Sequence, residues 1–390
     1  MKPLKIMVIG RNFPTKENGM TGIFEFGQAS AIAKIGMIVY YPAFDVRSIR
    51  RWRKWGIYKT VVNGVHVWNC SIPLSPLPAA IRKKIIEFIK PKLYKKIILD
   101  EGMPDIIHVH YPTNFPYDVF LPYQKLGSHI VATEHWSKVL KKELTTKQIG
   151  NLKQYVTHAD AFICVGELLK KSIQDLIGAA CDIKVLPNMI PQEFLYTNIK
   201  NKYDTTDQRP FIFIVVGRLI KIKQVDKIII AFAQRFNHSN SVLWILGDGE
   251  EREGLEELVL KLGISKQVKF WGLIAHGEVA SYIHKSNALI CFSRYETFGV
   301  PVAEAMCAGK PVIVSKCLGF LEYINSCCGI LVDSCNVNEL SNAMMEVYSN
   351  YADYNPKEIS AYGIKYFGED AVSHQLLDLY LNVWRHGEKL

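Results

Sequence analysis

The sequence predicts an α/β protein of two domains, each a parallel sheet covered by helices on both faces. Short apolar runs alternate with helical patterns, a rhythm typical of parallel sheets. The rhythm stops in a polar segment with three prolines, residues 187–210, and then restarts. The 390 residues also exceed what one ordinary hydrophobic core accommodates. We therefore expect domains over residues 1–190 and 210–368, joined by a linker at 191–209.

In the first domain, FEFGQASAIAKIG (24–36) has helical spacing and ends at a glycine. DIIHVHYP (105–112) ends another strand. The remaining apolar runs predict strands at 6–10, 129–133, 161–166 and 183–188.

The second domain repeats this rhythm, with a final amphipathic helix within 369–390 that we expect to pack across the domain interface. Ligands of open parallel sheets bind beyond the carboxyl ends of the strands, so functional residues should directly follow strands. The predicted strands are 211–217, 242–249, 268–272, 288–293, 311–315 and 329–333.

The composition, with 49% hydrophobic and 22% charged residues, is that of a soluble globular protein. No apolar run approaches the ~18–20 residues needed to span a bilayer, and MKPLKIMVIG is expected to be a first strand rather than a signal peptide. Nine scattered cysteines without a CxxC pair indicate reduced thiols and a cytoplasmic location.

The charge is uneven along the chain. Residues 1–100 contain 18 Lys and Arg but 5 Asp and Glu, an excess of +13, whereas the whole chain carries +10. Such asymmetry indicates a polyanionic partner or an anionic membrane surface.

The stretch RYETFGVPVAEAM (294–306) predicts a loop followed by a short helix that begins near Pro301. The amides of Phe298, Gly299 and Val300 would then point out of the helix start and form an anion site. Glu296 and Glu304 beside it are interpreted as acceptors for sugar hydroxyls. The alternative is that Glu296 is an ordinary loop residue and Glu304 a surface residue of the helix.

A second candidate anion site follows the strand at 211–217. Gly217 and Arg218 precede a basic loop that contains Lys223, and a guanidinium with an ammonium suits a pyrophosphate. The alternative is a solvated basic loop. Gly247 and Gly249 make a tight turn after the next strand, a weak signal by itself.

Glu296, seven residues and Glu304, followed by AMCAGKPVIVS, resemble the E-x7-E signature of the retaining glycosyltransferases of family 4 (GT4, glycosyl transferases group 1). The resemblance extends through VVGRL with Lys223, GDG, VKFWG and VLPN to GIFEFGQASAIAKIG, and so covers essentially the whole chain. It implies the GT-B fold, in which two Rossmann-like, doubly wound domains face each other across a cleft.

The resemblance also implies residue roles. Arg218 and Lys223 would bind the donor diphosphate, Glu296 the 3- and 4-hydroxyls of the transferred sugar, and Glu304 the ribose. Gln224 departs from the family, which often has glycine after this lysine, and the departure affects the turn more than the charge.

In the first domain, Gly22 matches the family pattern in a glycine-containing loop near the donor phosphate, and Gly19 is equally compatible with a surface loop. Thr133 and His135 match a T-x-H segment that the family places near the anomeric centre, although a lone histidine is more often structural. His108 and His110 lack the third ligand of a metal site. We therefore expect no metal.

Two basic segments carry the charge excess. RSIRRWRKW (47–55) interleaves cations with tryptophans, and residues 81–99 place Ile81, Ile85, Phe88 and Ile89 on one helical face until Pro91 interrupts the helix. Both suit an anionic membrane surface. The alternatives are a core-facing helix with a solvated basic side, an anionic acceptor or a nucleic acid, and nothing else in the sequence supports the last.

These observations predict a retaining glycosyltransferase that moves a hexosyl unit from a nucleotide diphosphate sugar to a hydroxyl of a glycan or lipid-linked acceptor. Bacterial cell-surface polysaccharide synthesis at the inner face of the cytoplasmic membrane is the expected context. No cofactor and no divalent metal are expected, because Arg218, Lys223 and the helix amides would stabilise the leaving diphosphate. The alternatives are a nucleotide-sugar epimerase or glycoside phosphorylase on the same fold, and a non-catalytic partner that binds glycan or membrane.

Overall fold

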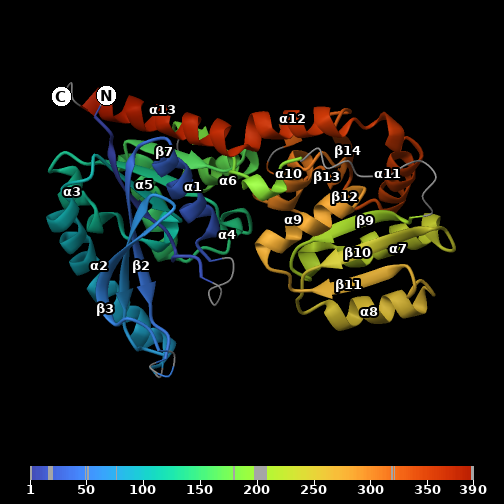
Figure 1. Ribbon diagram of the computed structural model, residues 1–390, viewed down its shortest axis with the longest axis horizontal. Coiled ribbons are helices and arrows are strands. Elements are labelled where there is room, and N and C mark those ends of the chain that lie inside the picture. The colour runs from blue at the N-terminus through green and yellow to red at the C-terminus, as the bar shows by residue number, and fades with distance from the viewer. Residues whose placement is uncertain are drawn as a thin grey trace. The chain divides into compact units, whose positions relative to one another are not determined.

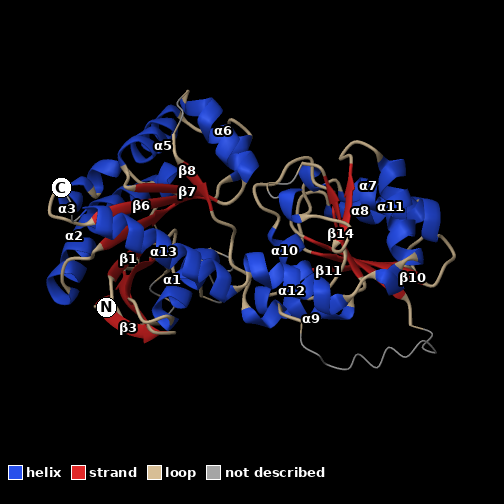
Figure 2. Ribbon diagram, turned by 90° about the horizontal axis from the view of Figure 1, so that it is seen from above, coloured by secondary structure: helices blue, strands red, loops and turns tan. Residues whose placement is uncertain are grey.

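The computed structural model describes residues 2–15, 21–48, 50, 52–75, 77–178, 181–196, 209–317, 319 and 321–387 (Figure 1). The chain forms two compact units. The first comprises Met1–Val165, Leu169–Met189 and Ser373–Leu390, and the second Gly166–Leu168 and Ile190–Val372. Each unit contains one sheet, and Figure 2 shows helices on both sides of the strands in each. This confirms the predicted class of two parallel-sheet α/β domains.

The sheet of the first unit has eight strands in the order β3-β4-β2-β1-β5-β6-β7-β8. All neighbouring strands are parallel except β3 and β4. The strands are β1 Lys5–Ile9, β2 Ile38–Asp45, β3 Gly56–Val62, β4 Val65–Ser71, β5 Ile106–His110, β6 His129–Glu134, β7 Ala161–Cys164 and β8 Ile183–Val185.

The β3–β4 hairpin adds an antiparallel edge to the predicted parallel sheet. Asn63 and Gly64 connect the two strands, and both have positive φ, 51° and 80°. This is the geometry of a type I′ turn, which matches the twist of antiparallel strands. An Asn-Gly pair between alternating residues is the sequence signal that could have found this edge.

The helices of the first unit include the long α2, which the sequence predicted to stop at Pro91. Instead, α2 runs through Pro91 without a break in its assigned range, and its buried residues Leu93, Tyr94 and Ile97 lie beyond the proline. Burial of that apolar stripe offsets the one backbone hydrogen bond that a proline removes. The helices are α1 Ile23–Lys34, α2 Ala79–Glu101, α3 Leu121–Gln124, α4 Ser137–Leu140 and α5 Thr146–His158, with 3-10 turns η1 Pro112–Asn114 and η2 Tyr117–Val119. Helices α6 Glu167–Ile177 and α13 Glu369–Gly387 begin in the second unit and continue in the first.

The sheet of the second unit is wholly parallel, in the order β11-β10-β9-β12-β13-β14. Its strands are β9 Phe211–Val216, β10 Ser241–Leu246, β11 Val268–Gly272, β12 Ala288–Cys291, β13 Val312–Ser315 and β14 Gly329–Val332. Its helices are α7 Val225–Phe236, α8 Arg252–Lys261, α9 His276–Lys285, α10 Val300–Cys307, α11 Val337–Ser349 and α12 Pro356–Phe367, with 3-10 turns η3 Gln192–Phe194, η4 Lys221–Lys223, η5 Leu321–Tyr323 and η6 Tyr351–Asp353.

The core of this unit lies between its sheet and the helices α7, α8 and α11, which pack together. Phe213, Phe232 and Phe236 are fully buried there. Helices α9, α10 and α12 form a second packed group. Of the predicted linker, Phe194 is buried, and residues 197–208 lie outside the described residues.

Strand order reverses once in each sheet. The chain goes from β9 outward to β10 and β11, and then returns to place β12 on the other side of β9. In the first unit, β2 lies on one side of β1 and β5 on the other. The connections then leave β9 and β12, or β1 and β5, in opposite directions, so a crevice opens at the carboxyl ends of these strands, where doubly wound sheets bind ligands.

Candidate functional site

An ion pair between Lys223 and Glu296 occupies the point of reversal between β9 and β12. Lys223 ends η4, directly after β9, and its Nζ donates to Oε2 of Glu296, which follows β12. The two loops are joined by the amide of Arg294, which donates to the carbonyl of Ile222 at 2.9 Å. The Glu296 amide donates in turn to the carbonyl of Cys317 at 3.2 Å.

Electrostatics keep Lys223 charged. Burial lowers its pKa, but the negative charge of Glu296 and the hydrogen bond to it more than offset this effect and raise the pKa above the ordinary value. Arg218 is exposed, and within the described chain its guanidinium makes no hydrogen bond or ion pair. Gly217, Arg218, Lys223 and Glu296 line one cavity of about 20 Å³ with Pro301, which is room for about one water molecule. The structure thus brings four predicted residues together.

Gln224 holds the Lys223 loop in place, a role that the sequence did not reveal. Its backbone is left-handed, with φ 50° and ψ 41°, the conformation that glycine adopts most easily. Its buried side chain donates to the carbonyls of Phe292 and Ser334, at 2.8 and 2.9 Å, and accepts from Nε of Arg294 at 3.3 Å. The glutamine therefore keeps the turn of a glycine and adds three bonds that fix the Lys223 loop to the ends of β12 and β14. Its departure from the family pattern was the available signal.

The start of α10 presents backbone amides, as predicted. Gly299 caps the helix in a left-handed conformation, and Pro301 lies in its first turn. The amides of Gly299 and Val300 donate to no other described residue. The side chain of Phe298 is buried and packs edge-on against Phe367, with ring centroids 5.7 Å apart. This packing fixes the loop that precedes the helix.

Glu304 is 1% exposed, so the alternative of a surface helix residue is wrong. Its Oε1 lies 2.6 Å from Nε2 of His276, the first residue of α9. Burial lowers the pKa of His276, but the hydrogen bond and charge of Glu304 outweigh it, and the pKa is raised. His276 is not among the residues predicted from the sequence. Its position shortly after the strand β11 is the signal that could have identified it.

Two predicted glycines have close backbone neighbours. A Cβ on Gly247 would lie 1.8 Å from the carbonyl oxygen of Gly217, so the turns after β9 and β10 touch only because residue 247 has no side chain. Gly22 caps α1 with φ 86°, and a Cβ there would lie 1.8 Å from the carbonyl oxygen of Asn12. Gly19 lies outside the described residues.

Another interaction missing from the sequence analysis lies at the end of β1. Glu25 of α1 is fully buried, and its carboxylate pairs with Nε of Arg11 at 2.8 Å. The guanidinium of Arg11 also lies over the ring of Tyr111, 4.0 Å from its centroid. A glutamate inside the apolar pattern of residues 23–32 was the available signal.

His135 belongs to a buried column of rings. Tyr111 stacks on His135 with centroids 4.9 Å apart, His135 stacks on His110 at 5.2 Å, and His110 lies 4.1 Å from His108. The ring of Tyr380, on α13, meets His108 edge-on. The column therefore joins β5 and β6 to the C-terminal helix within the first unit.

Hydrogen bonds fix the orientation of these histidines. Nδ1 of His135 lies 3.2 Å from Oδ1 of Asn188, so Nδ1 carries the proton, and Nε2 accepts from Nδ1 of His110 at 3.0 Å. His108 bonds Tyr380 through Nδ1 at 2.6 Å and Thr133 through Nε2 at 2.7 Å. Both ring nitrogens of His135 are thus engaged, and a substrate would have to replace one partner to reach the ring.

Burial keeps all three imidazoles neutral. It lowers the pKa of His135 to about 4 and that of His108 to about 3, and it lowers the pKa of His110 further below its usual value. Burial has the opposite effect on the carboxyl group of Glu134, whose pKa it raises. Hydrogen bonds from the amides of Trp136, His135 and Thr113 lower this pKa, but burial outweighs them and the pKa is about 7. In the described chain, no three His, Cys, Asp or Glu residues form a group that could hold a metal ion.

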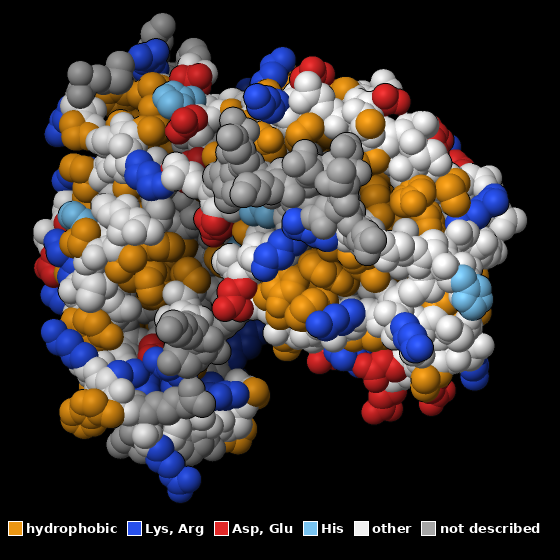
Figure 3. Space-filling model, turned by 45° about the vertical axis from the view of Figure 1, so that its right-hand side comes forward, with side chains coloured by type: hydrophobic (Ala, Val, Ile, Leu, Met, Phe, Trp, Pro, Cys, Tyr) orange, Lys and Arg blue, Asp and Glu red, His pale blue; other side chains and the backbone are white. Residues whose placement is uncertain are grey.

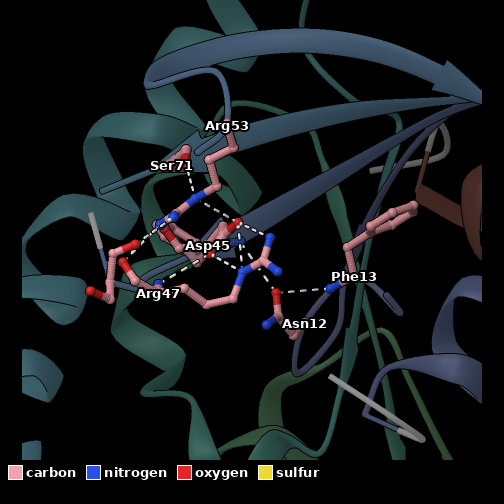
Figure 4. Close-up of polar contacts among 8 residues, drawn as sticks. Asn12, Phe13, Asp45, Arg47, Arg53 and Ser71 are labelled. Carbon is pink, nitrogen blue, oxygen red and sulfur yellow. Dashed lines mark hydrogen bonds and ion pairs between the residues drawn. The ribbon is translucent and has the colours of Figure 1, made fainter. Parts of the chain in front are cut away.

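The basic segment 47–55 does not present all of its cations to solvent (Figure 4). The Arg53 side chain is 9% exposed, pairs with Asp45 at 2.8 Å and donates to Oγ of Ser71 at 2.8 Å. Arg47 pairs with the same carboxylate at 2.7 Å. These two arginines fix the ends of β2 and β4, which corrects their interpretation as membrane contacts.

Exposed apolar residues do remain in this region. Trp52 is 90% exposed, and on α2 Ile81 and Phe88 are 46% and 66% exposed. The first half of α2 therefore does not face the core. None of the described helices combines the length and hydropathy needed to cross a bilayer.

These features define a class: doubly wound domains with a phosphate-compatible crevice where the strand order reverses. Residues 197–366 match the family described as Glycosyl transferases group 1, and residues 37–194 match Glycosyltransferase Family 4. The chain belongs to this family of glycosyltransferases.

Relatives and solved structures agree with this family. An uncharacterized glycosyltransferase of Methanocaldococcus jannaschii is 31% identical over 281 residues, 67% of this chain and 70% of its own. A lipopolysaccharide core biosynthesis glycosyltransferase of Rhizobium meliloti is 29% identical over 210 residues, 53% of this chain and 57% of its own.

Sucrose-phosphate synthase from Thermosynechococcus elongatus superposes with a TM-score of 0.75 at 19% identity, covering 99% of this chain and 100% of its own. The Anabaena protein HepE, solved with UDP-glucose, gives 0.70 at 17% identity, covering 97% and 100%. At these identities the two structures establish the fold alone, a glycosyltransferase GT-B fold.

The buried histidines predict a pH dependence of stability. Between about pH 4 and 6.5 the unfolded chain protonates all three imidazoles, whereas the native chain keeps them neutral, so stability falls as the pH decreases through this window. Glu134 acts in the opposite direction, because its native carboxyl keeps a proton up to about pH 7. On unfolding, three histidines therefore gain a proton and Glu134 loses one, so the unfolded state binds two more protons than the native state at these four groups.

The substitution His110→Phe keeps a ring in the column and removes one of the three imidazoles that take up a proton on unfolding. The slope of unfolding free energy against pH, measured by urea denaturation between pH 5 and 6, should then decrease by about 1.2 kcal/mol per pH unit, because the unfolded imidazole carries a proton in roughly 90% of chains there. An unchanged slope would show that His110 is protonated equally in the native and unfolded states.

Proposed function

We propose that this protein is a retaining glycosyltransferase that transfers a hexosyl unit from a nucleotide diphosphate sugar to a hydroxyl of a glycan or lipid-linked acceptor. The observation that carries the proposal is the crevice between β9 and β12. Arg218, Lys223 and the amides at the start of α10 supply positive charge there. Glu296 supplies a carboxylate beside them, and such a group repels phosphate but accepts hydroxyl hydrogen bonds.

Donor binding would exchange partners within the crevice. Without a ligand, Lys223 and Glu296 neutralise each other. A diphosphate would bind Lys223 and the sugar hydroxyls would bind Glu296, so neither of these partly buried charges would be left without a partner. Arg218 and the amides of Gly299 and Val300 would bind the remaining phosphate oxygens and stabilise the charge that develops on the leaving diphosphate.

Two further predicted roles belong to the proposal. Glu304, paired with His276, would accept the ribose hydroxyls by exchanging that partner. His135 would lie near the anomeric centre of the transferred sugar. We propose a front-face mechanism in which the departing phosphate helps to deprotonate the acceptor, because Glu25 pairs with Arg11 and Glu134 accepts backbone amides, which leaves neither as an obvious nucleophile.

The proposed context is bacterial cell-surface polysaccharide synthesis in the cytoplasm, with attachment to the inner face of the membrane. The lipopolysaccharide core enzyme of Rhizobium meliloti supports this choice as a relative, and the HepE complex with UDP-glucose supports a nucleotide diphosphate sugar as donor.

A panel of UDP-, GDP-, ADP- and CMP-sugars tests the proposed function. At least one diphosphate sugar should raise the melting temperature, since binding to the native state stabilises it. The same donor should then give a product of retained anomeric configuration by NMR. Conversion of the donor without any acceptor would show an epimerase instead.

Glu296→Gln should reduce kcat/KM with that donor by about 100-fold or more, because an amide accepts sugar hydroxyl bonds less strongly than a carboxylate. Glu257→Gln, on the exposed side of α8, removes the same charge outside the crevice and should change kcat/KM less than two-fold. Equal activities of the two variants would remove Glu296 from the mechanism.

Transfer should proceed at full rate in EDTA, because Arg218, Lys223 and the helix amides supply the positive charge at the diphosphate. Initial rates with and without added Mn²⁺ or Mg²⁺ measure this. A strict requirement for either ion would contradict the proposal.

The proposed membrane surface combines the exposed Trp52 and Phe88 with neighbouring cations. Trp52→Ala with Phe88→Ala should reduce co-sedimentation with anionic vesicles at least ten-fold. The control, Leu260→Ala with Leu273→Ala, removes two exposed apolar side chains from the second unit and should have no effect. Equal retention of both double variants would exclude this surface as the membrane contact.

A further inference from the structure

A second cavity, of about 520 Å³, lies wholly within the first unit. It opens at the carboxyl ends of β1, β2 and β5. Arg11 follows β1, Phe44 lies near the end of β2, and Asn114 and Phe115 come from the η1 turn after β5 and the residue that follows it. This is the point of reversal of the eight-stranded sheet, where a doubly wound fold binds ligands. The volume falls within the usual range of small-molecule sites, about 300–1,000 Å³.

One face of α2 forms the opposite wall. Its lining residues are 79, 82, 83, 86, 87 and 90, which recur at helical spacing. Three of them are cations, Arg82, Lys83 and Lys90, against the single carboxylate of Glu87. Over the described chain, none of the three cations forms an ion pair or hydrogen bond with another residue. Figure 3 shows Lys and Arg side chains gathered in the lower part of this unit.

Lys90 is the most constrained of these cations. Its Nζ lies 4.5 Å from the centroid of the Phe115 ring. Burial lowers the pKa of Lys90, the nearby charge of Glu87 raises it by a smaller amount, and Lys83 lowers it slightly, so the net shift is downward. A partly buried cation whose nearby carboxylate does not offset its loss of hydration is costly, and an anionic ligand would reduce that cost.

The rest of the lining is apolar and connects to the histidine column. Phe44, Val46, Ile86 and Phe115 provide surfaces for the carbon skeleton of a ligand. Arg11 lies over Tyr111, and Tyr111 stacks on His135. The cavity is therefore separated from His135 by a single ring.

We propose that this cavity binds an oxyanion, a phosphate or carboxylate, that is carried by the acceptor of the transfer reaction. The assignment to an acceptor rests on the proposed function. The oxyanion takes Arg82 and Lys90 as its counterions, and the attached polyol or sugar lies on the apolar lining. Ile81 and Phe88, the exposed apolar residues of α2, do not line this cavity, so a membrane surface and an acceptor site use different faces of the helix.

Binding of small probes tests the inference. Titrations followed by ligand-observed NMR at constant ionic strength use sn-glycerol 3-phosphate, glycerate, inorganic phosphate and glycerol. Glycerol 3-phosphate or glycerate should bind at least ten-fold more tightly than glycerol, and more tightly than inorganic phosphate. Binding of no anion, or equal binding of inorganic phosphate, would overturn the assignment to an acceptor.

The variant Arg82→Gln with Lys90→Gln should weaken binding of the preferred anionic probe at least ten-fold. The matched control, Lys84→Gln with Lys95→Gln, removes two charges from the same helix outside the cavity and should stay within two-fold of the wild type. Equal losses in both variants would indicate general attraction by a basic surface and would overturn the proposal. So would a loss of vesicle binding in the cavity variant with probe binding intact.

Melting temperatures with the nucleotide diphosphate sugar separate this inference from the proposed function. The cavity variant should keep the donor-induced shift of the wild type, because neither Arg82 nor Lys90 lines the crevice between β9 and β12. If the wild type binds the donor but no oxyanion, only the present inference fails. If it binds the oxyanion but no nucleotide sugar, the proposed donor fails and the anion site stands.

Discussion

The rest of the structure depends on the reversal of strand order in each sheet. In a parallel sheet every strand delivers its following loop to the same edge, and only at a reversal do the two neighbouring connections diverge and leave space between them. In the second unit this constraint brings Lys223, after β9, beside Glu296, after β12, although 72 residues separate them in the sequence. In the first unit it brings the ends of β1 and β5 together and opens the cavity between β1, β2, β5 and α2.

Charge pairing explains how polar crevices persist in a folded protein without a ligand. Lys223 and Glu296 satisfy each other, as do His276 and Glu304, so neither carboxylate is left as an uncompensated buried charge. In the proposed function, a ligand that offers phosphate to the lysine and hydroxyls to the glutamate would replace one set of partners by another. Such an exchange would make binding selective, because a ligand with only one of the two groups would leave a charge without a partner.

The sequence was sufficient for the fold class and for the group that lines the small cavity of the second unit. Strand periodicity and the glycine and proline positions locate strand ends, and strand ends locate Gly217, Arg218, Lys223 and Glu296. The sequence was insufficient where a role depends on a tertiary partner. Nothing in the local pattern pairs His276 with Glu304, or directs Gln224 to two distant carbonyls. The prediction that the helix stops at Pro91 was wrong for the same reason. Packing of Leu93, Tyr94 and Ile97 outweighs the tendency of proline to end a helix.

The basic charge of the first hundred residues is more local than its composition indicates. Three of the five acidic residues there form ion pairs. Glu25 pairs with Arg11, Asp45 pairs with Arg47 and Arg53, and Asp100 pairs with Lys96. These pairs neutralise cations that the sequence alone would count as available surface charge. Arg82, Lys83 and Lys90 have no such acid apart from Glu87, and they share one wall of one cavity. A general electrostatic attraction would not require this arrangement, since exposed lysines serve it equally well. Three cations gathered in a concave site beside a single carboxylate are suited to recognition of a discrete anion.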